Sequence, residues 1–261
     1  MNGLEPLLEH VIPAMLVIFR IGGLVLFGPL LVMAVVPIRV RVLLVFSMGL
    51  AAYPALSTGP LAGGMPDVQL WMLLPLVGME ITFGAVIGFL ATLPLLSAQV
   101  GGLVMGQQMG LGFARFFNPG VDDESDVIGQ LLFLFVLAVF LMMGGLEFMF
   151  AAVLHSFEYV PLGGFRPDIS LLELTNGMLL AAFEFALRMS APLLALIFLE
   201  TVAMGFVAKT VPQLNILSLG FPIRILAGIF FIAVGLYVIR EIMIINIDEG
   251  LSVIRLWVTS A

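Results

Sequence analysis

The sequence predicts an all-α membrane protein with five or six hydrophobic, partly broken helices. Hydrophobic residues make up 62% of the 261 residues and charged residues 10%, whereas about 45–50% and about 25% are usual in soluble domains. The mean hydropathy is +1.21, so a soluble fold of this length would leave much of the apolar surface exposed. In addition, several runs of about 20 residues carry few or no charges, and a helix of that length spans a bilayer.

The first run covers residues 11–36 and contains only one charge, Arg20. Glu5 and Glu9 precede it, where a signal peptide would carry Lys or Arg. We therefore expect this segment to remain in the mature protein. The second run covers 42–66 and weakens after Pro54, where turn-forming residues follow.

The third run is too long for one simple span. It extends from Val68 to Arg115 and is interrupted only by Glu80. Its charge-free part, 81–114, would be about 51 Å long as one helix, whereas a hydrocarbon core is about 30 Å thick. We expect the run to bend, break or leave the membrane at Pro94 or at one of its glycines. These glycines are Gly101, Gly102, Gly106, Gly110 and Gly112.

Three further runs follow, at about 127–146, 177–208 and 225–239. The acidic cluster 122–126 before the first of them lacks the spacing of a calcium loop, so it is interpreted as a helix cap. The tail, 240–261, alternates charged and apolar residues and is interpreted as an interfacial helix.

Several classes of function are excluded by composition. The chain has no cysteine and only two histidines, which leaves no thiolate or histidine-rich metal centre. Its net charge of −7 argues against a nucleic-acid partner. No phosphate-binding glycine loop, HExxH motif or Ser-His-Asp order is present. We therefore expect no enzyme activity, no cofactor and no metal.

Charged residues inside the apolar runs are the first candidates for function, because a charge in lipid is costly. Glu184 and Arg188 stand four apart on one helical face and can pair with each other. Arg20, Glu80 and Glu200 have no local partner. We expect them to pair between helices or between subunits, and a proton path in a transporter is the alternative.

Small residues recur at helix-packing distances, in Gly84-x-x-x-Gly88 and again in Gly102-x-x-x-Gly106-x-x-x-Gly110. The second repeat continues into a segment with Gln107, Gln108 and three phenylalanines. Irregular backbone of this kind must be buried in protein or line a cavity. It is either a helix break without a direct role or a constriction of bulky side chains on a pliable backbone.

Three blocks of sequence closely resemble the FliR/SctT family of type III secretion export-gate proteins. They are Arg20-Ile-Gly-Gly-Leu, Gly106-Gln-Gln-Met-Gly-Leu-Gly-Phe-Ala-Arg-Phe-Phe-Asn-Pro119 and Gly220-Phe-Pro-Ile-Arg224. A second likeness, to the two-helix protein FliQ, extends from Ala186 to Phe230. The resemblance implies a FliP-like part, 1–175, followed by a FliQ-like helical hairpin and C-terminal tail, 176–261.

The resemblance also implies partners and a place in the cell. One copy would join FliP and FliQ subunits in a hetero-oligomeric helical funnel, with FlhB docked outside and other flagellar export components nearby. The protein would belong to the bacterial inner membrane, in contact with lipid, at the flagellar basal body, and the funnel would lie above the usual membrane plane. It would pass unfolded substrate proteins without catalysis. The alternatives are the equivalent injectisome subunit, and an ion-coupled secondary transporter that uses Glu80, Glu147 or Glu200.

Specific residues inherit roles from the resemblance. The segment at about 106–120 matches the family's pore plug, whose residues here would be Gly106, Gln107, Gln108, Met109, Gly110, Gly112, Phe113, Phe116, Phe117 and Asn118. The phenylalanines would obstruct the pore and the glycines would let the loop move. The FliQ-like turn that carries Lys209 and Arg224 would face the cytoplasm, in agreement with the positive-inside rule.

Overall fold

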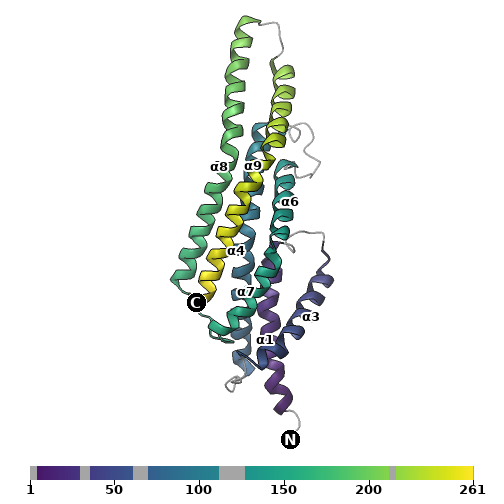
Figure 1. Cartoon of the computed structure of the whole chain (residues 1–261), viewed down its shortest axis with the longest axis vertical. Helices are drawn as coiled ribbons and strands as arrows, with labels where there is room; N and C mark the ends of the chain where they lie inside the picture. Colours follow the sequence, from purple (N-terminus) through teal and green to yellow (C-terminus); the bar gives the residue numbers. More distant parts are fainter. Residues whose placement is uncertain (1–4, 30–35, 61–69, 112–126, 212–215, 261) are drawn as a thin grey trace. The chain divides into compact units, whose positions relative to one another are not determined.

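The chain is almost entirely helical in a computed structural model that describes residues 5–29, 36–60, 70–111, 127–211 and 216–260. The elements are α1 (Glu5–Phe27), α3 (Ile38–Ser57), the 3-10 turn η1 (Leu70–Met72), α4 (Leu73–Gln108), α6 (Val127–Met142), α7 (Gly145–Tyr159), α8 (Ile169–Thr210) and α9 (Ile216–Ser260) (Figure 1). No strand occurs within these ranges.

The predicted fold class is confirmed. In the described part of the chain, five helices are long and apolar enough to cross a membrane, or six spans if α6 and α7 form one bent span. The bend lies at Gly144, which adopts the left-handed conformation at φ +74°. Glycine is favoured there because it has no Cβ to clash with the backbone.

Helix α4 continues through Pro94 and ends at Gln108, just before Gly110 at φ +85°. The predicted break of the third run at one of its glycines is therefore confirmed. One boundary differs from the sequence-based expectation. Helix α9 is 45 residues long and includes both the sixth run and the tail, so the separate tail helix is wrong. The buried residues Ile239, Met243, Ile247, Gly250 and Ile254 recur every three or four positions, and this one stripe carries the helix through the charged region.

The chain forms two compact units. Unit 1 contains residues 1–93, 140–178 and 247–261, and unit 2 contains 94–139 and 179–246. The boundary in α4 falls immediately before Pro94.

Unit 1 is organised by a close approach of α1 and α4, while α1 also packs on α3 and α7. A Cβ added to Gly23 would fall on the carbonyl oxygen of Ile81, and one added to Gly84 would fall on that of Arg20. A Cβ on Gly88 would meet the backbone of α1 at Leu24. The predicted packing role of Gly84-x-x-x-Gly88 is confirmed: without side chains at these positions, the two backbones approach directly.

Unit 2 packs the end of α4 against α6, α8 and α9. Gly102 lies against the backbone of Gly129 on α6, and Gly101 lies against Ala186 and Met189 on α8. A Cβ on Gly228 of α9 would meet the side chain of Met109 at 2.7 Å.

Candidate functional site

The polar centre of unit 1 is an ion pair between α1 and α4. Arg20 Nε donates to Glu80 Oε2 at 2.5 Å, and the Nη2 group of Arg20 donates to Glu80 Oε1 at 3.2 Å. Both side chains are fully buried. The two-pronged geometry matches the planar guanidinium to the carboxylate, and the glycine contacts between the same helices bring these residues together.

The remaining donors and acceptors of the pair are satisfied by the end of α7 and the loop after it. Arg20 Nη1 donates to Ser156 Oγ at 2.9 Å and to the carbonyl oxygen of Val160 at 3.1 Å. The backbone N–H of Gly163 donates to Glu80 Oε1 at 2.8 Å. The ion pair therefore links α1 and α4 to the end of α7 and the loop that follows it.

Aromatic rings enclose the guanidinium group. Its central carbon lies 4.1 Å from the ring centre of Phe157 and 4.7 Å from that of Phe83. Phe83 in turn stacks on Trp257 at 5.0 Å and meets Phe165 edge-on at 5.0 Å. The rings exclude water from the pair and add a cation–π attraction to it.

This buried ion pair links α1 to α4 and α7, and we call it the Arg20–Glu80 lock. Each carboxylate oxygen of Glu80 already accepts a hydrogen bond from Arg20. Removal of either charge would leave its partner buried and uncompensated, which typically costs about 3–5 kcal/mol.

In unit 2, Glu200 on α8 is paired with Arg224 on α9. Glu200 Oε2 accepts from Arg224 Nε at 3.0 Å and Nη2 at 2.9 Å, and Arg224 Nη2 also donates to Thr201 Oγ1 at 2.9 Å. The other oxygen, Glu200 Oε1, is buried without a hydrogen bond. Arg224, expected in the turn before the last helix, lies inside α9, while Lys209 lies in the last turn of α8 and is exposed.

Glu184 and Arg188 pair along α8, with Glu184 Oε1 2.6 Å from Arg188 Nη2. Their side chains are 60% and 77% exposed. Such an exposed pair contributes little to folding.

The structure describes the first part of the plug segment. Gly106, Met109 and Gly110 are buried in unit 2, whereas Gln107 and Gln108 are exposed. The helix closes with a hydrogen bond from Gly110 N to the carbonyl oxygen of Gln107 at 3.0 Å, and a Cβ on Gly110 would contact the ring of Phe221. Gly112, Phe113, Phe116, Phe117 and Asn118 lie outside the described residues.

Sequence reasoning did not identify the residues that surround the Arg20–Glu80 pair. Ser156 and Phe157, which contact Arg20, and Gly163, which donates to Glu80, carry no motif, and 136 positions separate Arg20 from Ser156. The one available signal was a small hydroxyl residue within the apolar stretch of α7. No cluster of three potential metal ligands occurs in the part of the chain that the structure describes.

The sequence is similar to known export proteins over almost its full length. The profile of a family described as "Bacterial export proteins, family 1" matches residues 11–249. Flagellar biosynthetic protein FliR of Bacillus subtilis is 27% identical over 235 residues, which cover 87% of each chain. FliR of Escherichia coli is 28% identical over 218 residues, covering 83% of this chain and 81% of the relative. Yop proteins translocation protein T of Yersinia pestis is 29% identical over 183 residues, or 69% of each chain.

Proposed function

Because the chain belongs to family 1 of the bacterial export proteins, we propose that it is a non-enzymatic subunit of the flagellar type III export gate. In this role it forms part of the inner-membrane entrance to the export channel and controls the passage of unfolded flagellar proteins. The family match over residues 11–249 is the observation that carries the proposal.

The chain is a multi-pass protein of the bacterial inner membrane. Its five or six membrane-length helices, in the described ranges, account for the membrane location. The flagellar members of the family account for the assignment to the inner membrane and the flagellum.

Exposed apolar side chains support association with further subunits. On the two long helices of unit 2, large apolar residues face outward, which requires a covering of lipid or protein. They include Phe183, Leu187, Phe198, Phe206, Leu226, Phe230 and Tyr237. In the proposed gate, FliP and FliQ subunits cover part of this surface, FlhB docks outside, and residues 176–261 act as a FliQ-like hairpin.

The plug assignment is supported by the way α4 ends. Small residues hold the end of the helix close to its neighbours, and Gly110 turns the chain out of the helix. The exposed Gln107 and Gln108 precede that turn. The segment that follows, with Phe113, Phe116 and Phe117, then seals the closed pore sterically until a substrate displaces it.

An ion-coupled transporter is the competing function, and the glutamates disfavour it. Glu80 is bound to Arg20 and Glu200 to Arg224. Glu147 is exposed in the first turn of α7. A proton path requires a carboxylate that can release its partner, whereas Arg20, the partner of Glu80, is also held by two hydrogen bonds and two aromatic rings.

We assign the chain to a flagellum rather than to an injectisome because the flagellar relatives match a larger share of it. The flagellar relatives from Bacillus and Escherichia match 87% and 83% of this chain, and the Yersinia translocation protein matches 69%. A cell that lacks its flagellar subunit and regains motility with this gene would support the flagellar assignment. Rescue of injectisome secretion alone would contradict it.

The gating role is tested by shortening the plug. Deletion of residues 112–118 in the assembled complex should make the membrane leaky to ions, measured as conductance in planar bilayers. Deletion of residues 61–67 removes the same number of residues from another connection and should leave the conductance low. Low conductance in the plug deletion, with the complex intact, would contradict the assignment.

A further inference from the structure

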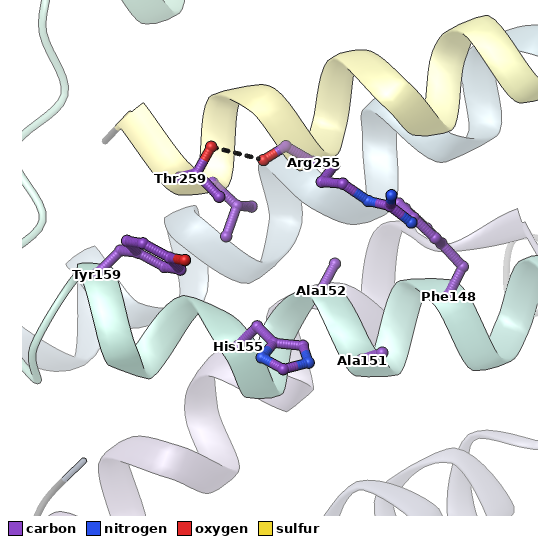
Figure 2. Close-up of a pocket in the computed structure, with 8 residues that line it drawn as sticks. Phe148, Ala151, Ala152, His155, Tyr159, Arg255 and Thr259 are labelled. Carbon is purple, nitrogen blue, oxygen red and sulfur yellow. Dashed lines mark hydrogen bonds between the residues drawn. The ribbon is translucent and has the colours of Figure 1, made fainter.

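Unit 1 contains a cavity of about 330 Å³ between α7 and the C-terminal part of α9 (Figure 2). Phe148 and Ala151 of α7 and Val258 of α9 form apolar walls. Its size is at the lower end of the range for small-molecule sites, and a mostly apolar wall with a few polar groups is typical of them. None of the lining residues takes part in the Arg20–Glu80 lock.

A cation without a counter-ion lies at the edge of the cavity. The guanidinium carbon of Arg255 lies 5.4 Å from the ring centre of Phe148, and Figure 2 shows the two side chains beside each other. Within the described residues, the Arg255 side chain makes no hydrogen bond or ion pair. Because this arginine is exposed and uncompensated at the edge of the cavity, it is available to an anion.

Beside the arginine, a second group can donate to a phosphate ester. The Tyr159 hydroxyl lines the cavity and has no hydrogen-bond partner in the described structure. Thr259 Oγ1 donates to the carbonyl oxygens of Arg255 and Leu256, so its hydrogen is used within α9 and it offers no donor to the phosphate. One carboxylate is close, that of Glu158, and its Oε1 lies 3.6 Å from Nδ1 of His155 on the same helix.

The cavity lies near the C-terminal ends of two apolar helices. Helix α7 ends at Tyr159 and α9 at Ser260. Tyrosine and arginine side chains suit a lipid headgroup site, because their apolar parts pack against hydrocarbon while their polar ends reach the headgroups.

We propose that this cavity binds the headgroup of an anionic phospholipid. Arg255 pairs with the phosphate diester, the Tyr159 hydroxyl donates to it, and the acyl chains leave along the wall formed by Ala151 and Val258. Free phosphate is a poorer occupant, because an apolar wall would desolvate the ion without compensation. This inference is independent of the export function, since lipid binding does not require a pore.

The test is native mass spectrometry of the full chain, co-expressed with its neighbouring export genes and extracted in mild detergent. Phosphatidylglycerol, phosphatidylcholine or inorganic phosphate is added, and the retained lipid is counted. Arg255→Gln should lower phosphatidylglycerol retention about fivefold, the contribution of one basic residue at an anionic membrane surface. Arg240→Gln, which removes an exposed charge from the same helix, should change retention little.

Two further variants separate the cavity from a general surface charge. Ala151→Leu fills the cavity without changing the charge and should also reduce retention, while Arg255→Lys should preserve most of it. Both positions are exposed, so these exchanges leave the buried core intact. Equal retention of the two lipids, or equal effects of Arg255→Gln and Arg240→Gln, would overturn the proposal. Displacement of the lipid by millimolar inorganic phosphate would instead identify a free-phosphate site.

Discussion

Replacement of Glu80 by glutamine should destabilise unit 1 strongly although the side chain keeps its shape. The carboxylate accepts from Arg20 Nε, Arg20 Nη2 and Gly163 N. Glutamine offers one oxygen and an NH2 group, and in either orientation that NH2 group faces a donor of Arg20. The buried guanidinium then loses its counter-charge and one of its two hydrogen bonds to residue 80, and it keeps the other together with Ser156, Val160 and the aromatic faces.

The expected cost is about 3–5 kcal/mol, the usual result of removing one partner from a buried pair. At about 2–4 °C per kcal/mol for a chain of this size, the melting temperature should fall by roughly 6–20 °C. Trp257 provides a local probe, because it stacks on the same Phe83 ring that Arg20 contacts. Its fluorescence can be followed during heating in a Trp71→Phe background, since the chain has two tryptophans.

Glu184→Gln is the matched control, because it makes the same exchange in an ion pair that is more than half exposed. It should cost less than about 1 kcal/mol. If Glu80→Gln melts within about 3 °C of this control, the lock does not stabilise the fold and the reasoning is refuted.

Other perturbations test the packing, a helix start and the second ion pair. Gly84→Ala places a methyl group on the carbonyl oxygen of Arg20 and should cost about 1–3 kcal/mol, whereas Gly78→Ala, with no atom within 4 Å, should be neutral or stabilising in the same melting assay. Hydrogen bonds from the Ser170 hydroxyl and the Leu171 N–H lower the pKa of Asp168. The helix cap should therefore be complete above the ordinary aspartate pKa of about 3.9, and it should be lost as the pH falls through the lower folded-state pKa. The loss is measured as faster hydrogen exchange at the Leu171 N–H. Exchange that does not depend on pH after correction for intrinsic rates would contradict this prediction. Arg224→Ala removes both hydrogen bonds that Arg224 donates to the partly buried Glu200. The complex should therefore lose more stability than in the Glu184→Gln control, above about 1 kcal/mol, and unchanged melting would show that Glu200 finds another partner.

The sequence was sufficient for the fold class and for contacts between near neighbours along a helix. Charge-free runs predicted the helices because a bilayer imposes their length and composition. The Glu184–Arg188 spacing indicated a pair because positions four apart share a helical face. By contrast, 60 positions separate Arg20 from Glu80 and 24 separate Glu200 from Arg224, and no local pattern encodes such contacts.

The predicted helix boundaries were wrong where a charged residue was taken to mark the limit of a helix. Arg224, Arg240 and Glu241 all lie inside α9, because the buried stripe of that helix continues past them. The glycine contacts between α1 and α4 explain which distant charges meet: the two backbones touch at Gly23 and Gly84, so Arg20 and Glu80 are placed opposite each other. Which distant charges meet is therefore decided by the tertiary packing of the helices.

The central claim, that the chain is one subunit of an export gate, is tested most directly by subunit composition. The tagged chain is co-expressed with its neighbouring export genes, and the mass of the intact complex is measured in mild detergent. The account predicts one copy of this chain bound to several small apolar subunits. A monomer or homodimer that is stable without those partners would contradict it and return the glutamates to consideration as transport residues.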